Sequence, residues 1–265
     1  MTPVYRVLYD GQLNASNFES TYINYGKRKR KISEIKKKEN KKVVLTIYRD
    51  KKSKDYTVKK SSVQLDTVSY KMKEKKIGYI AVSQFLENTG DQFDKAVTAL
   101  EKKGMKSLII DLRDNGGGLL NTCTQMVSRV IDKDKLIVYT KDKEGNKEEF
   151  KSDSGKTLEI PIIILVNGNT ASASEIMTGC LKDYGKATVV GTTTYGKGIV
   201  QNIMPLTDGS AIKFTIAKYY TPNGTDIHKK GIKPDVKVKM SDAQWKKAQT
   251  DEKADKQLKK AIELL

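Results

Sequence analysis

The pattern of hydrophobic and polar positions changes near residue 77. Beyond it, short apolar runs alternate with segments in which apolar residues recur every three or four positions. The runs "SLIIDL" and "IPIIILV" predict buried strands. The segment "TGDQFDKAVTALEKKG" predicts a helix with Phe93, Ala96, Val97 and Leu100 on one face. Alternating strands and helices are typical of an α/β domain, so we predict a mixed, largely parallel sheet with helices.

The rest of this region continues the alternation. We predict strands at "IGYIAVSQFL", "KLIVYT", "ATVVG" and "PDVKV", and helices in "GGGLLNTCTQMVSRVI" and "SASEIMTGCLKDYG". The stretch "GIVQNIMPLTDGSAIKFTIAKYYT" predicts a hairpin that turns at "TDG". Residues 241–265 open with a Ser-x-x-Gln capping box and predict a C-terminal surface helix.

The N-terminal quarter is patterned differently. The runs "VVLTIYR" and "KDYTVKK" alternate and flank "DKKS", which predicts a β-hairpin. Residues 61–76 are expected to be a linker strand. Residues 1–42 show little pattern, and "KRKRKISEIKKKENKK" is either a helix with a solvated basic face or a flexible segment.

The net charge suggests binding to an acidic partner, but the location of the basic residues argues against it. The chain has a formal charge of +18, which suggests nucleic acid or a membrane surface as a partner. Residues 1–76 carry +13 of it, from 21 Lys and Arg against 8 Asp and Glu. The basic runs lack the interleaved aromatic residues that stack on single-stranded nucleic acid. We therefore expect no specific nucleic-acid partner.

Other bulk features exclude little. No apolar run approaches the ~18 residues of a membrane span, and "MTPVYRVLYDGQL" shows no signal peptide, so no membrane anchor is expected in this chain. Cys123 and Cys180 sit in apolar helical patterns and are expected to be buried free thiols.

Two loops could carry chemistry. In "DLRDNGGGLL", three glycines between a strand and a helix allow positive φ and expose N–H groups that can bind an oxyanion. A tight strand-to-helix turn is the alternative. In "VNGNTASASEI", Thr170, Ser172 and Ser174 follow a buried strand, where α/β sites usually lie. A serine there could merely cap the helix, with Glu175 as a first-turn acid that the helix dipole favours.

A third loop, "GTTTYGKGIVQ", carries Lys197 between Gly196 and Gly198. A helix over residues 172–184 would carry the chain ~18 Å away from the serines, at 1.5 Å per residue. A strand over residues 186–191 would return it ~20 Å, so Lys197 is expected to reach them.

This placement suggests a base for the serine. A serine hydroxyl attacks only when a base accepts its proton, and a lysine in an apolar setting can be that base. The only histidine, His228, lies in the turn-rich "GTDIHKKGIKPDV", and we interpret it as a structural or substrate-side residue.

With these residues in place, the chain resembles the carboxyl-terminal processing (tail-specific) proteases of the S41 serine peptidase family. The resemblance covers residues 77–238 and rests on "KIGYIAVSQF", "KSLIIDLRDNGGGLL", "VNGNTASASEI", "LKDYGKATVVGTTTYGKGIVQ" and "DIHKKGIKPDV", in that order. It implies Ser172 as nucleophile, Lys197 as base, Gln201 as the residue that orients the lysine, and Asp183 in a supporting role.

The resemblance also implies an oxyanion hole formed by the N–H groups of Gly118 and Ala173, with Ser174 supporting the helix start. It implies a core of the ClpP/crotonase-like type and no metal or organic cofactor. The family loop often reads Asn-Asn-Pro-Gly-Gly, whereas this one reads "RDNGGG" without the proline.

Family members usually carry an export signal or membrane anchor and then a PDZ domain that binds substrate C-termini. Here residues 1–60 resemble only a partial or degenerate PDZ module, followed by a linker over 61–76, a peptidase core over 77–240 and a helix over 241–265. The resemblance suggests a bacterial envelope location if an anchor lies upstream.

The main hypothesis is thus a Ser-Lys endopeptidase that acts through an acyl-enzyme on proteins or peptides with accessible C-termini. A catalytically silent peptide-binding or scaffold relative is the alternative.

Overall fold

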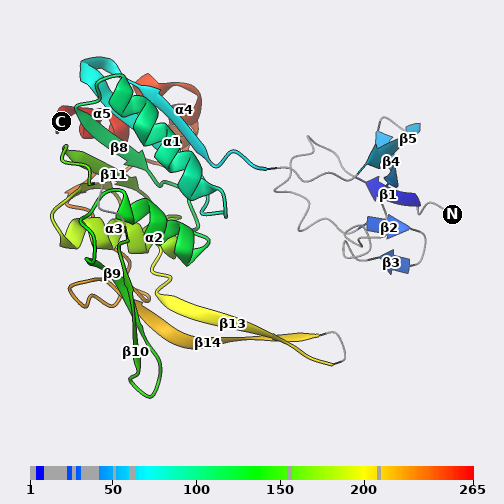
Figure 1. Cartoon of the computed structure of the whole chain (residues 1–265). Coiled ribbons are helices and arrows are strands. Elements are labelled where there is room, and N and C mark those ends of the chain that lie inside the picture. The colour runs from blue at the N-terminus through cyan, green and yellow to red at the C-terminus, as the bar shows by residue number, and fades with distance from the viewer. Residues whose placement is uncertain are drawn as a thin grey trace. The chain divides into compact units, whose positions relative to one another are not determined.

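The structure is a computed structural model of the 265-residue chain. It describes residues 4–8, 23–25, 28–30, 42–49, 52–59, 64–153, 157–207 and 210–265. The chain forms two units, residues 1–64 and residues 65–265 (Figure 1). Among the described residues, no helix combines the length and the apolar character needed to span a bilayer.

The first unit is built from short strands. β4 (Lys42–Arg49) and β5 (Lys52–Lys59) form the antiparallel pair predicted from their alternation, in which Arg49 pairs with Lys52. β1 (Val4–Leu8) lies parallel to β4, while β2 (Ile23–Tyr25) pairs with β3 (Arg28–Arg30). Sequence reasoning missed β1 to β3. A basic helix or flexible segment was expected over residues 27–42. Residues 28–30 form β3 instead and residue 42 begins β4, while residues 27 and 31–41 lie outside the described residues.

The second unit is organised around a six-stranded sheet in the order β15-β12-β11-β8-β7-β6. Its pairs are parallel except for β6 with β7, which confirms the prediction of a largely parallel sheet. The strands are β6 (Val68–Met72), β7 (Ile77–Val82), β8 (Ser107–Asp111), β11 (Ile162–Val166), β12 (Thr188–Gly191) and β15 (Val236–Lys237).

Helices cover both faces of this sheet (Figure 1). α1 (Thr89–Lys102), α2 (Leu120–Ser128) and α3 (Ala173–Asp183) pack on one face, and α5 (Lys256–Glu263) packs on the other. Side chains alternate along a strand, so Leu108 and Ile110 join the first core whereas Ile109 joins the second. Every residue of β8 and β11 is buried, which explains the apolar runs at 108–110 and 162–166.

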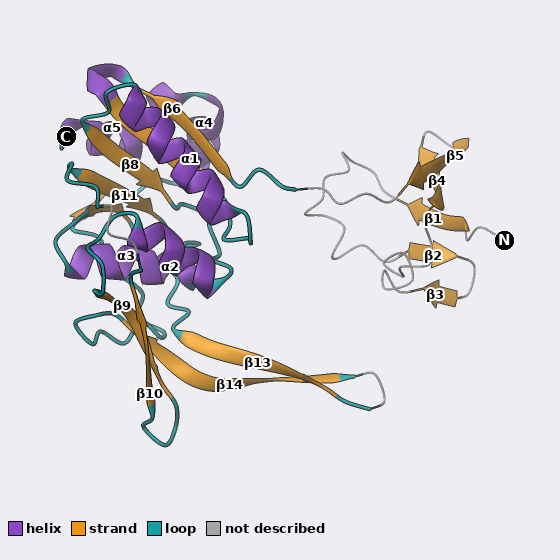
Figure 2. Cartoon of the chain, viewed as in Figure 1, coloured by secondary structure: helices purple, strands orange, loops and turns teal. Residues whose placement is uncertain are grey.

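A smaller sheet in the order β10-β9-β14-β13 adjoins this core. Its strands are β9 (Leu136–Lys141), β10 (Lys147–Lys151), β13 (Ile199–Pro205) and β14 (Ala211–Tyr220). β13 and β14 form the predicted hairpin, which extends away from the helices as a ribbon (Figure 2). The expected "TDG" turn includes residues 208–209, which lie outside the described residues. The charged strand β10 was not predicted.

Two segments differ from expectation at the ends of this unit. The segment expected to be a linker strand, 61–76, does contain a strand, β6, but β6 is the edge strand of the main sheet, and a short 3-10 helix, Glu74–Lys76, follows it. The expected C-terminal helix is two helices, α4 (Asp242–Thr250) and α5, separated by a 3-10 turn at Glu252–Ala254. The predicted capping box is present, because the Ser241 hydroxyl accepts from the Gln244 N–H at 3.3 Å.

Candidate active site

Three loops meet at one edge of the main sheet. They follow β8, β11 and β12, which are neighbours in the sheet and run parallel, so their carboxyl ends share an edge. The first loop is the triple-glycine segment, the second contains Ser172 and the third contains Lys197. The structure therefore brings together the loops that sequence reasoning placed at a common edge.

Ser172 has a strained backbone at the start of α3. Its φ of 58° and ψ of −118° lie where non-glycine residues cost roughly 1–3 kcal/mol. The N–H of Glu175 donates to the Ser172 carbonyl oxygen at 2.9 Å. The Ser172 and Glu175 side chains also form a capping box at the start of α3, with the Ser172 hydroxyl toward the Glu175 N–H and the Glu175 carboxylate on the Ser172 N–H. The strained turn places Ser172 at the sheet edge, as in nucleophile elbows.

The neighbouring hydroxyls are engaged elsewhere. Thr170 and Ser174 are both fully buried. The Thr170 Oγ1 donates to the Leu112 carbonyl oxygen at 2.8 Å, and the Ser174 Oγ donates to the Asn115 carbonyl oxygen at 3.0 Å. Both hydroxyls thus fasten the serine loop to the glycine loop, which leaves Ser172 as the partly exposed hydroxyl of the three.

The two cysteines do not offer a competing nucleophile. Both are buried and free. Burial raises the pKa of the Cys123 thiol to about 12, and its Sγ donates to the Ala173 carbonyl oxygen at 3.1 Å. Burial also raises the pKa of the Cys180 thiol. Since the thiolate is the reactive form, neither cysteine is activated at neutral pH.

The Glu175 carboxylate joins the serine loop to the lysine loop. It is fully buried. Its Oε2 accepts from the N–H of Ser172 at 2.9 Å and from the N–H of Lys197 at 2.8 Å. Its Oε1 accepts from the Thr194 hydroxyl at 2.5 Å and the Gly196 N–H at 2.7 Å. The Ser172 and Lys197 backbones therefore lie on either side of one oxygen atom.

Sequence reasoning assigned Glu175 only a helix-dipole role. The signal for more was its position three residues after Ser172, the spacing at which a side chain reaches back to the preceding N–H. The link to the lysine loop carries no such local signal, because it spans more than twenty residues of chain.

The glycines around Lys197 allow two backbone segments to approach closely. A Cβ on Gly198 would lie 2.4 Å from the His228 nitrogen, and one on Gly196 would lie 3.0 Å from the Gly231 nitrogen. The Lys229 N–H also donates to the Gly196 carbonyl oxygen at 2.8 Å. The turn around His228 is thus the platform on which the lysine loop rests.

The Lys197 and His228 side chains are each partly buried. The His228 N–H donates to Asp226 Oδ1 at 2.9 Å, while its Nδ1 is buried without a partner among the described residues. Its backbone contact with Gly198 fits the interpretation of His228 as a structural residue.

The triple-glycine loop lies directly against Ser172. A Cβ on Gly117 would lie 2.8 Å from both the Ser172 Cβ and the Ala173 nitrogen. The Gly117 N–H donates to Asn115 Oδ1 at 2.9 Å, and its carbonyl oxygen accepts from the Phe85 N–H at 3.1 Å. In a trans peptide the C=O and N–H point in opposite directions, so the Gly118 N–H points away from Phe85.

The N–H groups of Gly118 and Ala173 donate no hydrogen bond within the described part of the chain. Ala173 directly follows Ser172, and Gly118 directly follows Gly117, the glycine that lies against Ser172. Free backbone donors in such loops are what an oxyanion requires.

Two residues implied by the family resemblance lie outside this centre. Gln201 is exposed on β13, opposite Thr215, and no hydrogen bond joins its amide to Lys197 in the described structure. Asp183 is the last residue of α3, a full helix length from Ser172, and its Oδ2 accepts from the Asn223 N–H at 2.8 Å. Asp183 therefore holds a distant turn. The described residues also contain no group of three His, Cys, Asp or Glu side chains placed to hold a metal ion.

The fold and site define an α/β protein in which a strained serine, a lysine loop and free backbone donors share one sheet edge. The model of Peptidase family S41 matches residues 76–238, more than half of the chain. The chain therefore belongs to Peptidase family S41.

Individual relatives agree with this membership. A "Probable CtpA-like serine protease" of Staphylococcus aureus (strain N315) is 42% identical over 209 residues, which cover 78% of this chain and 42% of that protein. The "Carboxy-terminal processing protease CtpA" of Bacillus subtilis (strain 168) is 42% identical over 71% of this chain and 40% of its own length. This chain thus spans about two fifths of the length of these relatives.

A solved structure shares the architecture. The photosystem II D1 C-terminal processing protease superposes with a TM-score of 0.61 at 31% identity, over 70% of this chain and 52% of that one.

Proposed function

We propose that this chain is the catalytic part of a serine endopeptidase that uses Ser172 as nucleophile and Lys197 as general base. The observation that carries the proposal is the shared Glu175 Oε2, which accepts from the N–H groups of both residues. Three further features support it: the strained Ser172 backbone, the partly exposed hydroxyl and the free backbone donors of Gly118 and Ala173.

The chemistry divides into two steps. The Ser172 Oγ attacks the carbonyl carbon of the scissile peptide while the Lys197 Nζ accepts the hydroxyl proton. The resulting oxyanion receives hydrogen bonds from the N–H groups of Gly118 and Ala173, each worth about 3–4 kcal/mol in comparable enzymes. The amine leaves with the proton from Lys197, and water, deprotonated by Lys197, then hydrolyses the acyl-enzyme.

Gln201 has the proposed role of orienting the Lys197 side chain. It is four residues beyond the lysine, at the base of an exposed ribbon. Because β13 is already paired with β14, this role requires the strand to shift toward the lysine loop when substrate binds.

The proposed substrates are proteins or peptides cut near an accessible C-terminus. Two relatives support this substrate class, because their names describe carboxy-terminal processing. The contribution of residues 1–60 to substrate capture, as a partial PDZ-like module, belongs to the same proposal.

The test is cleavage of an unfolded protein with an apolar C-terminal tail, together with labelling by a fluorophosphonate probe. Ser172→Ala and Lys197→Ala should each abolish cleavage, and probe should attach to Ser172 in the wild type. The matched controls Ser69→Ala and Lys233→Ala remove exposed side chains and should keep wild-type turnover. Wild-type turnover by either site variant would disprove the assignment, and an unlabelled wild-type Ser172 would favour the catalytically silent alternative.

A further inference from the structure

The C-terminal segment, residues 241–265, reaches the entrance of the triple-glycine loop. α5 is fixed to the sheet by Leu258 and Ala261, whereas α4 contains no buried residue. Between the two helices stands Asp255, which is only 4% exposed. A buried carboxylate at a surface segment needs a partner, and the partner here is Arg113.

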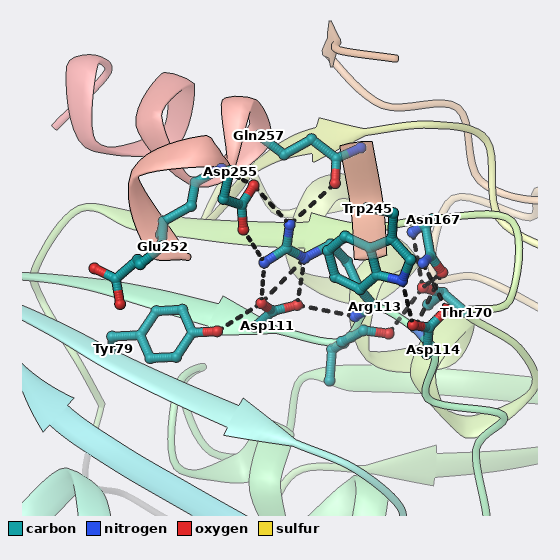
Figure 3. Close-up of polar contacts among 12 residues, drawn as sticks. Tyr79, Asp111, Arg113, Asp114, Asn167, Thr170, Trp245, Glu252, Asp255 and Gln257 are labelled. Atoms are coloured by element: carbon teal, nitrogen blue, oxygen red, sulfur yellow. Dashed lines mark hydrogen bonds and ion pairs between the residues drawn. The ribbon is translucent and has the colours of Figure 1, made fainter. Parts of the chain in front are cut away.

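Arg113 lies between β8 and the glycine loop and binds one carboxylate from the end of β8 and one from the C-terminal segment (Figure 3). Its Nε donates to Asp111 Oδ1 at 2.9 Å, and its Nη2 lies 2.5 Å from Asp111 Oδ2. Its Nη2 also lies 2.8 Å from Asp255 Oδ2, while its Nη1 donates to Asp255 Oδ1 at 3.0 Å and to Gln257 Oε1 at 3.1 Å. Planar, bidentate geometry of this kind gives strong and directional pairs.

The charge balance keeps the Arg113 guanidinium ionised. Burial alone disfavours the charged form, but the hydrogen bonds and charges of Asp111 and then Asp255 outweigh it, so the pKa of Arg113 is raised. With one cation between two carboxylates, removal of either acid leaves Arg113 less well compensated in a buried place.

Trp245 attaches α4 to the same point. The Arg113 Cζ lies 4.5 Å from the centroid of the Trp245 ring, a cation–π contact. The Trp245 Nε1 donates to Asp114 Oδ2 at 2.9 Å (Figure 3). The C-terminal segment thus contacts both residues that immediately precede Asn115.

Asp114 passes this contact on to the serine loop. It has a positive φ of 58°, which a non-glycine residue keeps only when its surroundings hold it. Its Oδ1 accepts from the Asn167 and Asn169 side-chain amides, each at 2.8 Å. The next residue, Asn115, accepts from the Ala171 N–H with its carbonyl oxygen and from the Gly117 N–H with its side chain.

We infer that Trp245 and Asp255 are positioning residues of the active site, which hold Arg113 and Asp114 so that the glycine loop presents the Gly118 N–H to the reaction. The inference rests on the proposed function and extends it to a segment beyond the matched family region, which ends at residue 238. Neither residue touches the substrate; both act through the loop.

Two conservative variants of the full chain test this role. Trp245→Phe keeps an aromatic ring over Arg113 but removes the N–H donor to Asp114. Asp255→Asn keeps an acceptor for the Leu258 N–H, which Asp255 caps at 2.9 Å, but removes the charge that faces Arg113. With a fluorogenic peptide, kcat should fall about 3- to 10-fold for Trp245→Phe and about 10-fold or more for Asp255→Asn. KM should stay within about 2-fold, because the oxyanion forms only after binding.

The design separates positioning from mere stability. Lys246→Ala, an exposed neighbour on α4, is the control and should match the wild type. The double variant Asp114→Ala/Trp245→Phe should be no slower than Asp114→Ala alone, since both remove the same contact. Trp245 is the only tryptophan of the chain, so its emission should shift to longer wavelength in Asp114→Ala.

The outcomes distinguish this inference from the proposed function. If probe labels Ser172 in the wild type but labels both variants at the same rate, with kcat unchanged and only the urea midpoint lowered, the segment is structural and the inference is wrong. Independent, additive effects of Asp114→Ala and Trp245→Phe would also overturn it. If wild-type Ser172 is not labelled at all, the proposed function itself fails.

Discussion

Helix α3 carries a carboxylate near each end, and each accepts the N–H of a distant loop. Glu175, in the first turn, is fully buried and accepts from four donors that include the N–H groups of Ser172 and Lys197. Asp183, the last residue, is partly exposed and accepts from the Asn223 N–H. Both fix a loop, but only the first loop contains residues of the proposed chemistry.

The difference lies in access to water. Donors left unpaired in a buried place cost about 1–3 kcal/mol each, whereas water can replace a lost partner near the surface. Glu175 therefore makes the geometry of Ser172 and Lys197 depend on a single side chain. The Asp183 contact lies nearer the surface, and α3 separates Asp183 from Ser172 by roughly 16 Å at 1.5 Å per residue.

The largest effect is expected for Glu175→Gln. The glutamine amide must turn an NH₂ group toward two donors, which leaves them unpaired and repels them. We expect unfolding free energy to fall by about 2–4 kcal/mol and turnover to fall at least about 100-fold. Urea unfolding and peptide turnover measure the two effects, with the exposed Glu144→Gln as a matched control.

A Glu175→Gln enzyme with near wild-type turnover would show that Ser172 and Lys197 are positioned by other contacts. Glu175 would then matter no more to the positions of Ser172 and Lys197 than Asp183 does.

A smaller effect is expected where the lysine loop meets its platform. In Gly198→Ala the new Cβ would lie 2.4 Å from the His228 nitrogen, so one backbone segment must shift. We expect about 1–3 kcal/mol of lost stability and about a 10-fold loss of turnover. Gly168→Ala is the control, because a Cβ there meets nothing within 4 Å. Equal behaviour of the two variants would show that the platform does not position Lys197.

The sequence predicted the elements that carry a local period. The helix with Phe93, Val97 and Leu100 and the buried strands β8 and β11 follow from apolar spacing alone. The rise per residue of a helix and a strand was enough to predict that the lysine loop returns to the serine loop. Local patterns do not show which residues far apart in the sequence contact each other. The link between Glu175 and Lys197 and the parallel pairing of β1 with β4 leave no mark in spacing.

The C-terminal region shows the same limit in another form. Ser241 and Gln244 predicted where α4 begins, and this was confirmed. The start of α5 has a local signal that sequence reasoning missed, because Asp255 caps it through the Leu258 N–H. The burial of Asp255 against Arg113 depends on a contact 142 residues away, which local pattern cannot reveal.

The smallest expected effect belongs to Asp183→Ala. The variant removes the acceptor of the Asn223 N–H, which is exposed enough for water to take its place. We expect about 1 kcal/mol or less of lost stability in urea unfolding and turnover within about 2-fold of the wild type. A loss of activity near that of Glu175→Gln would contradict this. It would mean that the turn at Asn223 transmits its position to the lysine platform, since Ile227 and His228 follow a few residues later. A small effect would instead show that Asp183 stabilises only the distant turn, and that Glu175 in the first turn of α3 is the carboxylate of this helix that positions Ser172 and Lys197.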